Sequence, residues 1–173
     1  MLCESDECRK LIAEQLSDMA DIKGSDILVR IEKSIEIKAS SEKVWEMLAF
    51  DKAQEWMEEW KSVEYTSEVR SSEDKYKVGA SAHITEKHAS IEFDFEITES
   101  LKNEKIMWRS NKFSMIRSYT LKPTEMGTIV TTVFEYTSPY SILGKIVDKV
   151  GGVRIAKKEI EKSLEQLKNV VEK

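Results

Sequence analysis

The chain contains few of the residues that characterise disulfide-rich, collagenous or proline-rich proteins. Its 173 residues include 2 cysteines, 2 prolines and 6 glycines. Cys3 and Cys8 are five positions apart, a spacing that matches neither a disulfide framework nor a C-x-x-C redox or metal motif. With 40% hydrophobic residues, the chain has enough apolar side chains to exclude a disordered protein. We therefore expect a globular protein with free thiols in a reducing compartment.

Long hydrophobic runs and an excess of positive charge are also missing. No apolar stretch approaches the ~18 residues that a membrane-crossing helix needs. Residues 1–7 are acidic, whereas a secretory signal begins with a basic segment followed by an apolar one. The formal net charge of −5 argues against nucleic acid as a partner, because such binding requires a basic surface. These absences predict a cytoplasmic protein with no transmembrane segment and no nucleic-acid partner.

Motifs for cofactors, metals and covalent catalysis are absent too. The 2 histidines, His83 and His88, are five positions apart on one expected strand, and therefore on opposite faces of it, with no cysteine nearby. The sequence has no phosphate-binding loop, no G-x-S-x-G and no H-E-x-x-H. We therefore predict neither a cofactor nor a metal site.

The length suits one domain, preceded by a short appendage. In residues 1–26, apolar side chains recur at helical spacing, and Gly24 marks the end of this pattern. The pattern predicts an amphipathic N-terminal helix, which docks on the domain, joins two copies into a homodimer, or frays. Residues 27–173 then form the domain itself.

Alternation of apolar and polar residues dominates the middle of the chain. Its period of two is typical of strands with one buried face. Ser40 or Ser41 starts a helix after the first strand, and Asp51 is placed to cap a second short helix. Short loops separate the later strands, which predicts an antiparallel meander. The expected strands span 27–38, 63–69, 80–88, 91–97, 106–110, 113–121 and 128–137.

The last part of the chain has helical spacing. An apolar stripe runs from residue 141 to residue 173, with a break expected at Gly151-Gly152. Together the elements predict an α+β fold in which a curved antiparallel sheet of six or seven strands wraps around one long C-terminal helix. Because such a sheet encloses more volume than one helix fills, we expect an internal cavity between the two.

The order of the elements and several short motifs resemble one known superfamily. The residues that carry the likeness are IEIKASSEKVW at 35–45, Trp56-Met57 followed by KSVE at 61–64, Gly79, and Gly127-Thr128. Over about residues 28–172 they resemble the START-domain and birch-pollen-allergen (SRPBCC) superfamily, in its polyketide cyclase/dehydrase or coenzyme-Q-binding-like branch. The resemblance implies the helix-grip fold with two short helices after the first strand. Residues 58–60 depart from the Pro-Gly-Val that the family carries there.

Strand parity predicts which side chains line the cavity. The inward positions are mostly aliphatic and aromatic with a few polar groups among them, which is the composition of a small-molecule site. Arg117 on this face needs Glu86 or a ligand anion as its partner, unless a bulge shifts the strand. The candidate ligand-binding residues are Trp56, Trp60, Ile84, Glu86, His88, Phe93, Phe95, Trp108, Arg117, Tyr119, Phe134 and Tyr136.

Three functions agree with this reading, since the resembled superfamily includes lipid carriers, enzymes, toxin components and co-chaperones. The first is non-catalytic binding or transport of a hydrophobic small molecule, such as a lipid, an isoprenoid quinone or a polyketide-like compound. The second is a protein-interaction module of the toxin or co-chaperone type, with the N-terminal helix as a docking element. The third is a cyclase/dehydratase in which Glu86 and His88 act as acid and base and Arg117 anchors the substrate.

Overall fold

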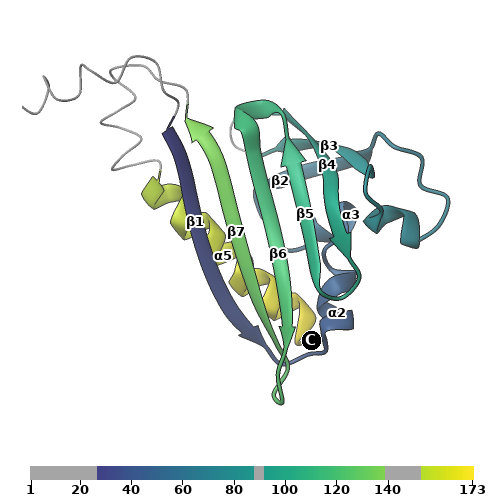
Figure 1. Cartoon of the computed structure of the whole chain (residues 1–173), viewed down its shortest axis with the longest axis vertical. Coiled ribbons are helices and arrows are strands. Elements are labelled where there is room, and N and C mark those ends of the chain that lie inside the picture. The colour runs from purple at the N-terminus through teal and green to yellow at the C-terminus, as the bar shows by residue number, and fades with distance from the viewer. Residues whose placement is uncertain (1–26, 88–91, 139–152) are drawn as a thin grey trace, which may run out of the picture.

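Seven antiparallel strands form one curved sheet around a C-terminal helix (Figure 1). The computed structural model describes residues 27–87, 92–138 and 153–173. The strand order β1-β7-β6-β5-β4-β3-β2 places β1 and β2 at opposite edges of the sheet. The predicted α+β helix-grip fold is therefore confirmed. The strands are β1 (Ile27–Ile37), β2 (Trp60–Tyr65), β3 (Ser81–Glu86), β4 (Glu92–Leu101), β5 (Lys105–Ser110), β6 (Met115–Pro123) and β7 (Thr128–Ser138).

Two short helices connect the two edges of the sheet, because β1 and β2 are consecutive in the chain. Ser40 caps the first of them, with its hydroxyl accepting a hydrogen bond from the Lys43 amide at 3.3 Å, as expected. The helices are α2 (Ser41–Glu46), α3 (Phe50–Ala53) and α5 (Val153–Val171), with 3₁₀ turns η1 (Glu73–Tyr76) and η2 (Lys112–Ser114).

Asp51 does not cap the second helix. The cap residue of α3 is Ala49, which makes no side-chain capping bond, and Asp51 lies within the first turn. Its carboxylate instead accepts a hydrogen bond from the Tyr65 hydroxyl at 2.9 Å and pairs with Lys75 at 2.6 Å. The Asp51 carboxylate therefore binds Tyr65 and Lys75, which are distant in the chain, and does not cap the helix.

Several strand limits differ from those expected. β2 begins at Trp60 and ends at Tyr65, because Trp60 already pairs with Glu86 across a register shift before Ser62. β4 continues to Leu101, past a second register shift after Ile97. The expected N-terminal helix, His88, Ile91 and the first part of the expected C-terminal helix (141–152) lie outside the described residues.

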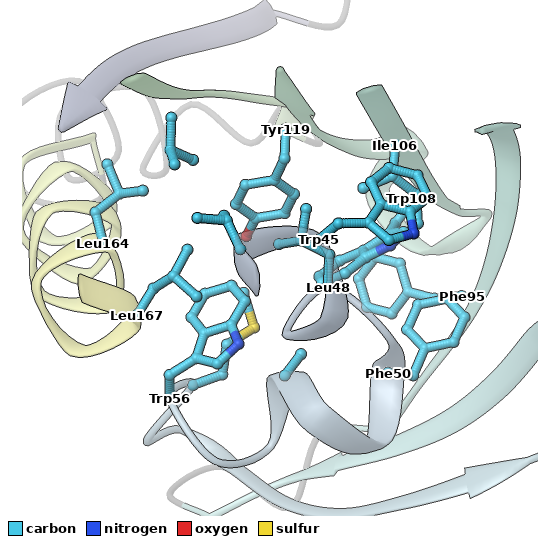
Figure 2. Close-up of a cluster of buried hydrophobic side chains, with 14 of the residues drawn as sticks. Trp45, Leu48, Phe50, Trp56, Phe95, Ile106, Trp108, Tyr119, Leu164 and Leu167 are labelled. Carbon is cyan, nitrogen blue, oxygen red and sulfur yellow. The ribbon is translucent and has the colours of Figure 1, made fainter. Parts of the chain in front are cut away.

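Aromatic side chains pack together between the sheet and the short helices (Figure 2). The fully buried Trp108 lies with its ring centroid 5.2 Å from that of Phe50 and 5.1 Å from that of Tyr119. Trp56 meets Tyr119 edge-on at 5.8 Å. Such pairs contribute about 0.5–1.5 kcal/mol each beyond their burial. The buried face of α5 completes this core with Ile160, Leu164, Leu167 and Val171.

Candidate functional site

A small pocket lies between α5, the α3–β2 loop and the middle of the sheet. Its volume is about 80 Å³, which is room for two or three water molecules rather than for a ligand of ordinary size. The lining residues are Trp56, Met57, Glu58, Glu59, Trp60, Glu86, Arg117, Glu159, Lys162, Ser163 and Gln166.

Arg117 reaches into this pocket from the middle of β6 and has few acceptors there. One guanidinium nitrogen, Nη1, donates to the sulfur of Met57 at 3.4 Å, and Nε is buried without a hydrogen-bond partner in the described part of the chain. Within the same ranges, no carboxylate lies within 4.0 Å of the guanidinium, so the expected Glu86–Arg117 ion pair is not formed. A guanidinium carries five N–H donors, and a thioether sulfur is a weak acceptor. The arrangement leaves Arg117 able to bind a further oxygen acceptor.

Carboxylates from three elements surround the pocket. Burial raises the pKa of Glu86 on β3, and the negative charges of Glu159 and Glu59 raise it further, while Arg117 and Lys112 oppose these effects. Burial likewise raises the pKa of Glu159 on α5, with the charge of Glu59 adding to it. The neutral form of both groups is thus favoured more than in an ordinary glutamate. The pocket combines Arg117 and the paired Lys162 with acids whose neutral form is favoured.

Exposed polar contacts join α5 to the pocket rim. Lys162 pairs with Glu58 at 2.5 Å, and the Gln166 amide donates to the same carboxylate at 2.8 Å. On the other flank of the helix, Lys33 of β1 pairs with Glu161 at 2.5 Å. Exposed pairs of this kind contribute about 1 kcal/mol at most. The apolar face of α5 therefore supplies most of its docking energy, and the rim contacts oppose its movement only weakly.

The structure distributes the candidate site residues in three ways. Trp56, Trp60, Glu86 and Arg117 line the pocket. Phe134 and Tyr136 on β7 are partly buried, with Phe134 in contact with Arg117, and His88 lies outside the described residues. The remaining candidates are buried among other core residues: Ile84, Phe93, Phe95, Trp108 and Tyr119.

Sequence reasoning missed the polar side chains that α5 and the loop before β2 contribute, although it named Trp56 in that loop. Glu159, Lys162 and Gln166 line the pocket from the helix, and Glu58 and Glu59 line it from the loop. The polar positions on α5 lie beside the apolar stripe that the helical spacing of the sequence predicted. Polar residues adjacent to that stripe were the available signal for them.

A larger groove of about 750 Å³ lies on another side of the molecule, between α2, η1 and the β4–β5 turn. Its aromatic lining residues, Trp45 and Tyr76, stack on each other with ring centroids 5.4 Å apart. Three of its four lysines have partners: Lys52 pairs with Glu55, Lys75 with Asp51, and Lys77 with Asp74. Its open shape and mixed charge favour no particular ligand.

Two further observations concern metals and membranes. No group of three or more His, Cys, Asp or Glu side chains within the described ranges is placed to hold a metal ion. In the same ranges, no helix combines the length and the apolar character that crossing a bilayer requires.

Several solved structures share this fold. A protein of unknown function from Staphylococcus aureus has a TM-score of 0.69 at 14% identity, covering 86% of this chain and 96% of that one. A protein from Thermus thermophilus has a TM-score of 0.62 at 16% identity, covering 84% and 97%. The Aha1 protein of Colwellia psychrerythraea, solved as a dimer, has a TM-score of 0.59 at 20% identity, covering 83% and 96%. At these identities the likeness shows the fold alone.

Comparison by sequence gives a family. No curated protein matches the chain. The family described as polyketide cyclase / dehydrase and lipid transport matches residues 29–172, which includes every strand and helix described above except the first two residues of β1. This match agrees with the seven-stranded sheet, the two short helices and the C-terminal helix. The chain therefore belongs to the polyketide cyclase / dehydrase and lipid transport family.

Proposed function

We propose that this protein binds an apolar small molecule carrying a neutral oxygen acceptor, held between α5 and the concave face of the sheet. The observation that supports the proposal most strongly is the state of Arg117. Its guanidinium lies over an aromatic ring, its Nε is buried without a partner in the described ranges, and its Nη1 donates to a sulfur, which is a weak acceptor. Burial of an incompletely bonded charge is costly, and a ligand oxygen would offset that cost.

The charges around Arg117 favour a neutral acceptor over an anion. Glu59, Glu86 and Glu159 border the pocket, and the nearby Lys162 already pairs with Glu58. The negative charge of a carboxylate or phosphate would be repelled by these acids. A ketone, quinone or ester carbonyl carries no such charge and could still accept a hydrogen bond from the guanidinium. A hydroxyl on the same ligand would find an acceptor in Glu86 or Glu159. Quinones, neutral lipids and polyketide-like compounds combine such oxygens with a large apolar surface.

The pocket must enlarge to admit a ligand of this size. The rim contacts of α5 are exposed and contribute little, so displacement of the helix from the α3–β2 loop is the least costly way to open it. Burial of the ligand would return about 25 cal/mol per Å² of apolar surface. The cytoplasmic location expected from the sequence stays a prediction.

The test is a thermal-shift series with defined compounds. A short-chain isoprenoid quinone and a neutral monoacylglycerol should raise Tm, and a fatty-acid anion should raise it less. Native mass spectrometry of protein purified from cells should detect a bound neutral compound that denaturation releases. If none of the three compounds raises Tm and nothing is retained, the proposal is wrong.

A cyclase/dehydratase activity is the second candidate. It is favoured by the convergence of Arg117 and Glu86 on one pocket, with burial raising the pKa of Glu86 towards the range of a general acid. Turnover of a poly-β-ketone thioester analogue, lost in Glu86→Gln but kept in Glu96→Gln on the outer face, would establish it.

The protein-interaction reading and the homodimer through residues 1–26 remain proposals. Mass in solution distinguishes them from a monomeric carrier. A full chain with the mass of a dimer, together with a monomeric variant lacking residues 1–26, would favour the homodimer.

A further inference from the structure

Three cations that do not line the pocket gather on the first turns of α5. Arg154, Lys157 and Lys158 are all exposed, and in the described ranges none lies within 4.0 Å of a carboxylate. Other cations of this helix are paired, Lys162 with Glu58 and Lys168 with Glu172. The unpaired charges are thus concentrated at one end of the helix.

Large apolar side chains are exposed at the same end of the molecule. Ile155 lies between the cations along the helix and is 58% exposed, and Leu28 at the start of β1 is 64% exposed. The ion pair between Lys33 and Glu161 and the hydrogen bond from the Lys38 amide to Glu172 show that β1 and α5 run side by side in the same direction. The start of β1, with Leu28 on its outer face, and the first turns of α5 therefore lie at the same end of the molecule (Figure 1).

The opposite edge of the sheet carries the opposite charge. On the outer face of β2, β3 and β4, exposed acids surround His83, which pairs with Asp94 at 2.8 Å. The strand order separates these strands from β1 by the width of the sheet. The molecule has a basic corner and an acidic edge although its net charge is −5. The exposed acids are Glu64, Glu92, Asp94 and Glu96.

We infer that the corner formed by Arg154, Ile155, Lys157, Lys158 and Leu28 docks on an anionic lipid bilayer. The cations would meet the lipid headgroups, and the exposed isoleucine and leucine would enter the interface between headgroups and acyl chains. The acidic edge would face away from the membrane, so the electrostatic field orients the protein. Glu159 lines the pocket and is next to Lys158 in the chain. Docking would therefore bring the pocket close to the lipid surface, about one turn of α5 away.

A lipid surface fits this corner better than other polyanions do. Nucleic acids require a broad basic surface, and the acidic edge would oppose their wrapping around the protein. An acidic protein would pair with the three cations but would leave Leu28 and Ile155 without an apolar counterpart. A bilayer supplies both the negative charge and the apolar layer. The inference rests on the proposed function in one respect: it names the membrane as the place where the ligand is exchanged. Docking itself can be measured with an empty pocket.

The test is sedimentation of the full chain with vesicles. Binding to mixed phosphatidylcholine–phosphatidylglycerol vesicles should exceed binding to pure phosphatidylcholine and should fall at high ionic strength. Each basic residue near an anionic surface strengthens binding about fivefold, so the triple variant Arg154→Gln, Lys157→Gln, Lys158→Gln should bind about a hundredfold more weakly. Ile155→Ser should also weaken binding. Because this loss comes from apolar contact and not from charge, it should persist at high ionic strength.

The matched control changes three exposed lysines elsewhere in the fold. The variant Lys61→Gln, Lys102→Gln, Lys122→Gln has the same net charge as the first triple variant and should bind anionic vesicles much as the unchanged protein does. Equal losses in the two triple variants, no preference for anionic vesicles, or retention by heparin without vesicle binding would each overturn the inference.

The same variants separate this inference from the proposed function. The Arg154, Lys157, Lys158 triple variant should keep its Tm response to the soluble short-chain quinone, because those side chains do not line the pocket. Vesicle binding without any Tm response would support membrane docking and contradict the proposed binding of a ligand in the pocket. A Tm response without vesicle binding would support the pocket ligand and contradict membrane docking.

Discussion

The guanidinium of Arg117 lies over the aromatic ring of Phe134, with its Cζ atom 5.0 Å from the ring centroid. The two residues are directly opposite each other on the neighbouring strands β6 and β7. A cation on an aromatic face gains about 0.5–2 kcal/mol, depending on how far it is desolvated. This contact holds the charge on the concave face of the sheet without using its hydrogen-bond donors. Nε, which has no partner in the described ranges, stays available to a ligand.

Replacement of Arg117 by methionine should weaken ligand binding without destabilising the empty protein. A hydrogen bond to a charged group contributes about 1.5–3 kcal/mol, so affinity for a quinone or neutral lipid should fall about tenfold or more. The Tm of the empty variant should be unchanged or higher, because a poorly bonded charge has been removed. Arg109→Met, on the outer face of β5, is the matched control. Unchanged affinity in Arg117→Met would rule out the contact.

Glu86→Gln should stabilise the protein at neutral pH, and the gain should disappear in acid. Burial is the main cause that raises the folded-state pKa of Glu86 above its ordinary value of 4.5, so the folded protein binds this proton more tightly than the unfolded chain. The stabilisation that protonated Glu86 contributes is fully present below pH 4.5 and is lost as pH rises through the folded-state pKa. Because the side chain is partly exposed, the gain should be below about 1 kcal/mol.

Urea unfolding at a series of pH values, from below 4.5 to neutrality, measures this effect of Glu86. Glu96→Gln, at an exposed position on the outer face of β4, is the matched control. A stabilisation by Glu86→Gln that persists unchanged in acid would have another cause than ionisation.

Trp56 and Trp108 should respond differently to replacement by phenylalanine. Both are fully buried, but the Trp56 indole donates to the Met47 carbonyl at 2.8 Å, whereas the Trp108 indole nitrogen has no partner in the described part of the chain. Each replacement opens a similar cavity, and Trp56→Phe also leaves a carbonyl without its donor. We expect Trp56→Phe to lower the free energy of unfolding by about 1 kcal/mol more than Trp108→Phe. Equal losses in urea unfolding would contradict this.

Gly127→Ala should be among the most destabilising single changes outside the core. A methyl group there would lie 2.1 Å from the Ile37 carbonyl oxygen and 2.9 Å from the Lys38 Cα atom, and backbone atoms cannot move aside cheaply. We expect a loss of about 3 kcal/mol or more, measured by calorimetry. Gly79→Ala is the comparison: its φ is +90°, but no atom lies within 4 Å of the added methyl, so the cost should be about 1–2 kcal/mol.

Strand parity predicted the inward-facing side chains well. Ala82, Ile84, Phe93, Phe95 and Trp108 all face the core as expected. The pleat of a strand has a period of two whatever the strand packs against, so the face of each residue is a local property. The shifts in β2 and β4 did not disturb this outcome, because each lies at the end of a strand or past its buried part.

The composition of the pocket could not be obtained in the same way. Glu159 and Gln166 reach it only because α5 docks at a particular rotation and depth against the sheet. Asp51 was expected to cap a helix, yet Tyr65 and Lys75, both distant in the chain, bind its carboxylate. Interactions between distant segments decide such roles, and a single sequence does not display them.

The amino-acid sequence alone determined the alternation of the strands, the two short helices after the first strand, the apolar stripe of α5 and, through its motifs, the family. These follow from short-range periodicity and local capping, which depend on neighbouring residues. The tertiary structure decided that aromatic rings pack together between the sheet and the short helices, that Arg117 lies on Phe134 instead of pairing with Glu86, and that the unpaired cations of α5 lie at one corner of the sheet. Volume, charge pairing and surface fields depend on which distant side chains come together, and only the folded chain specifies that.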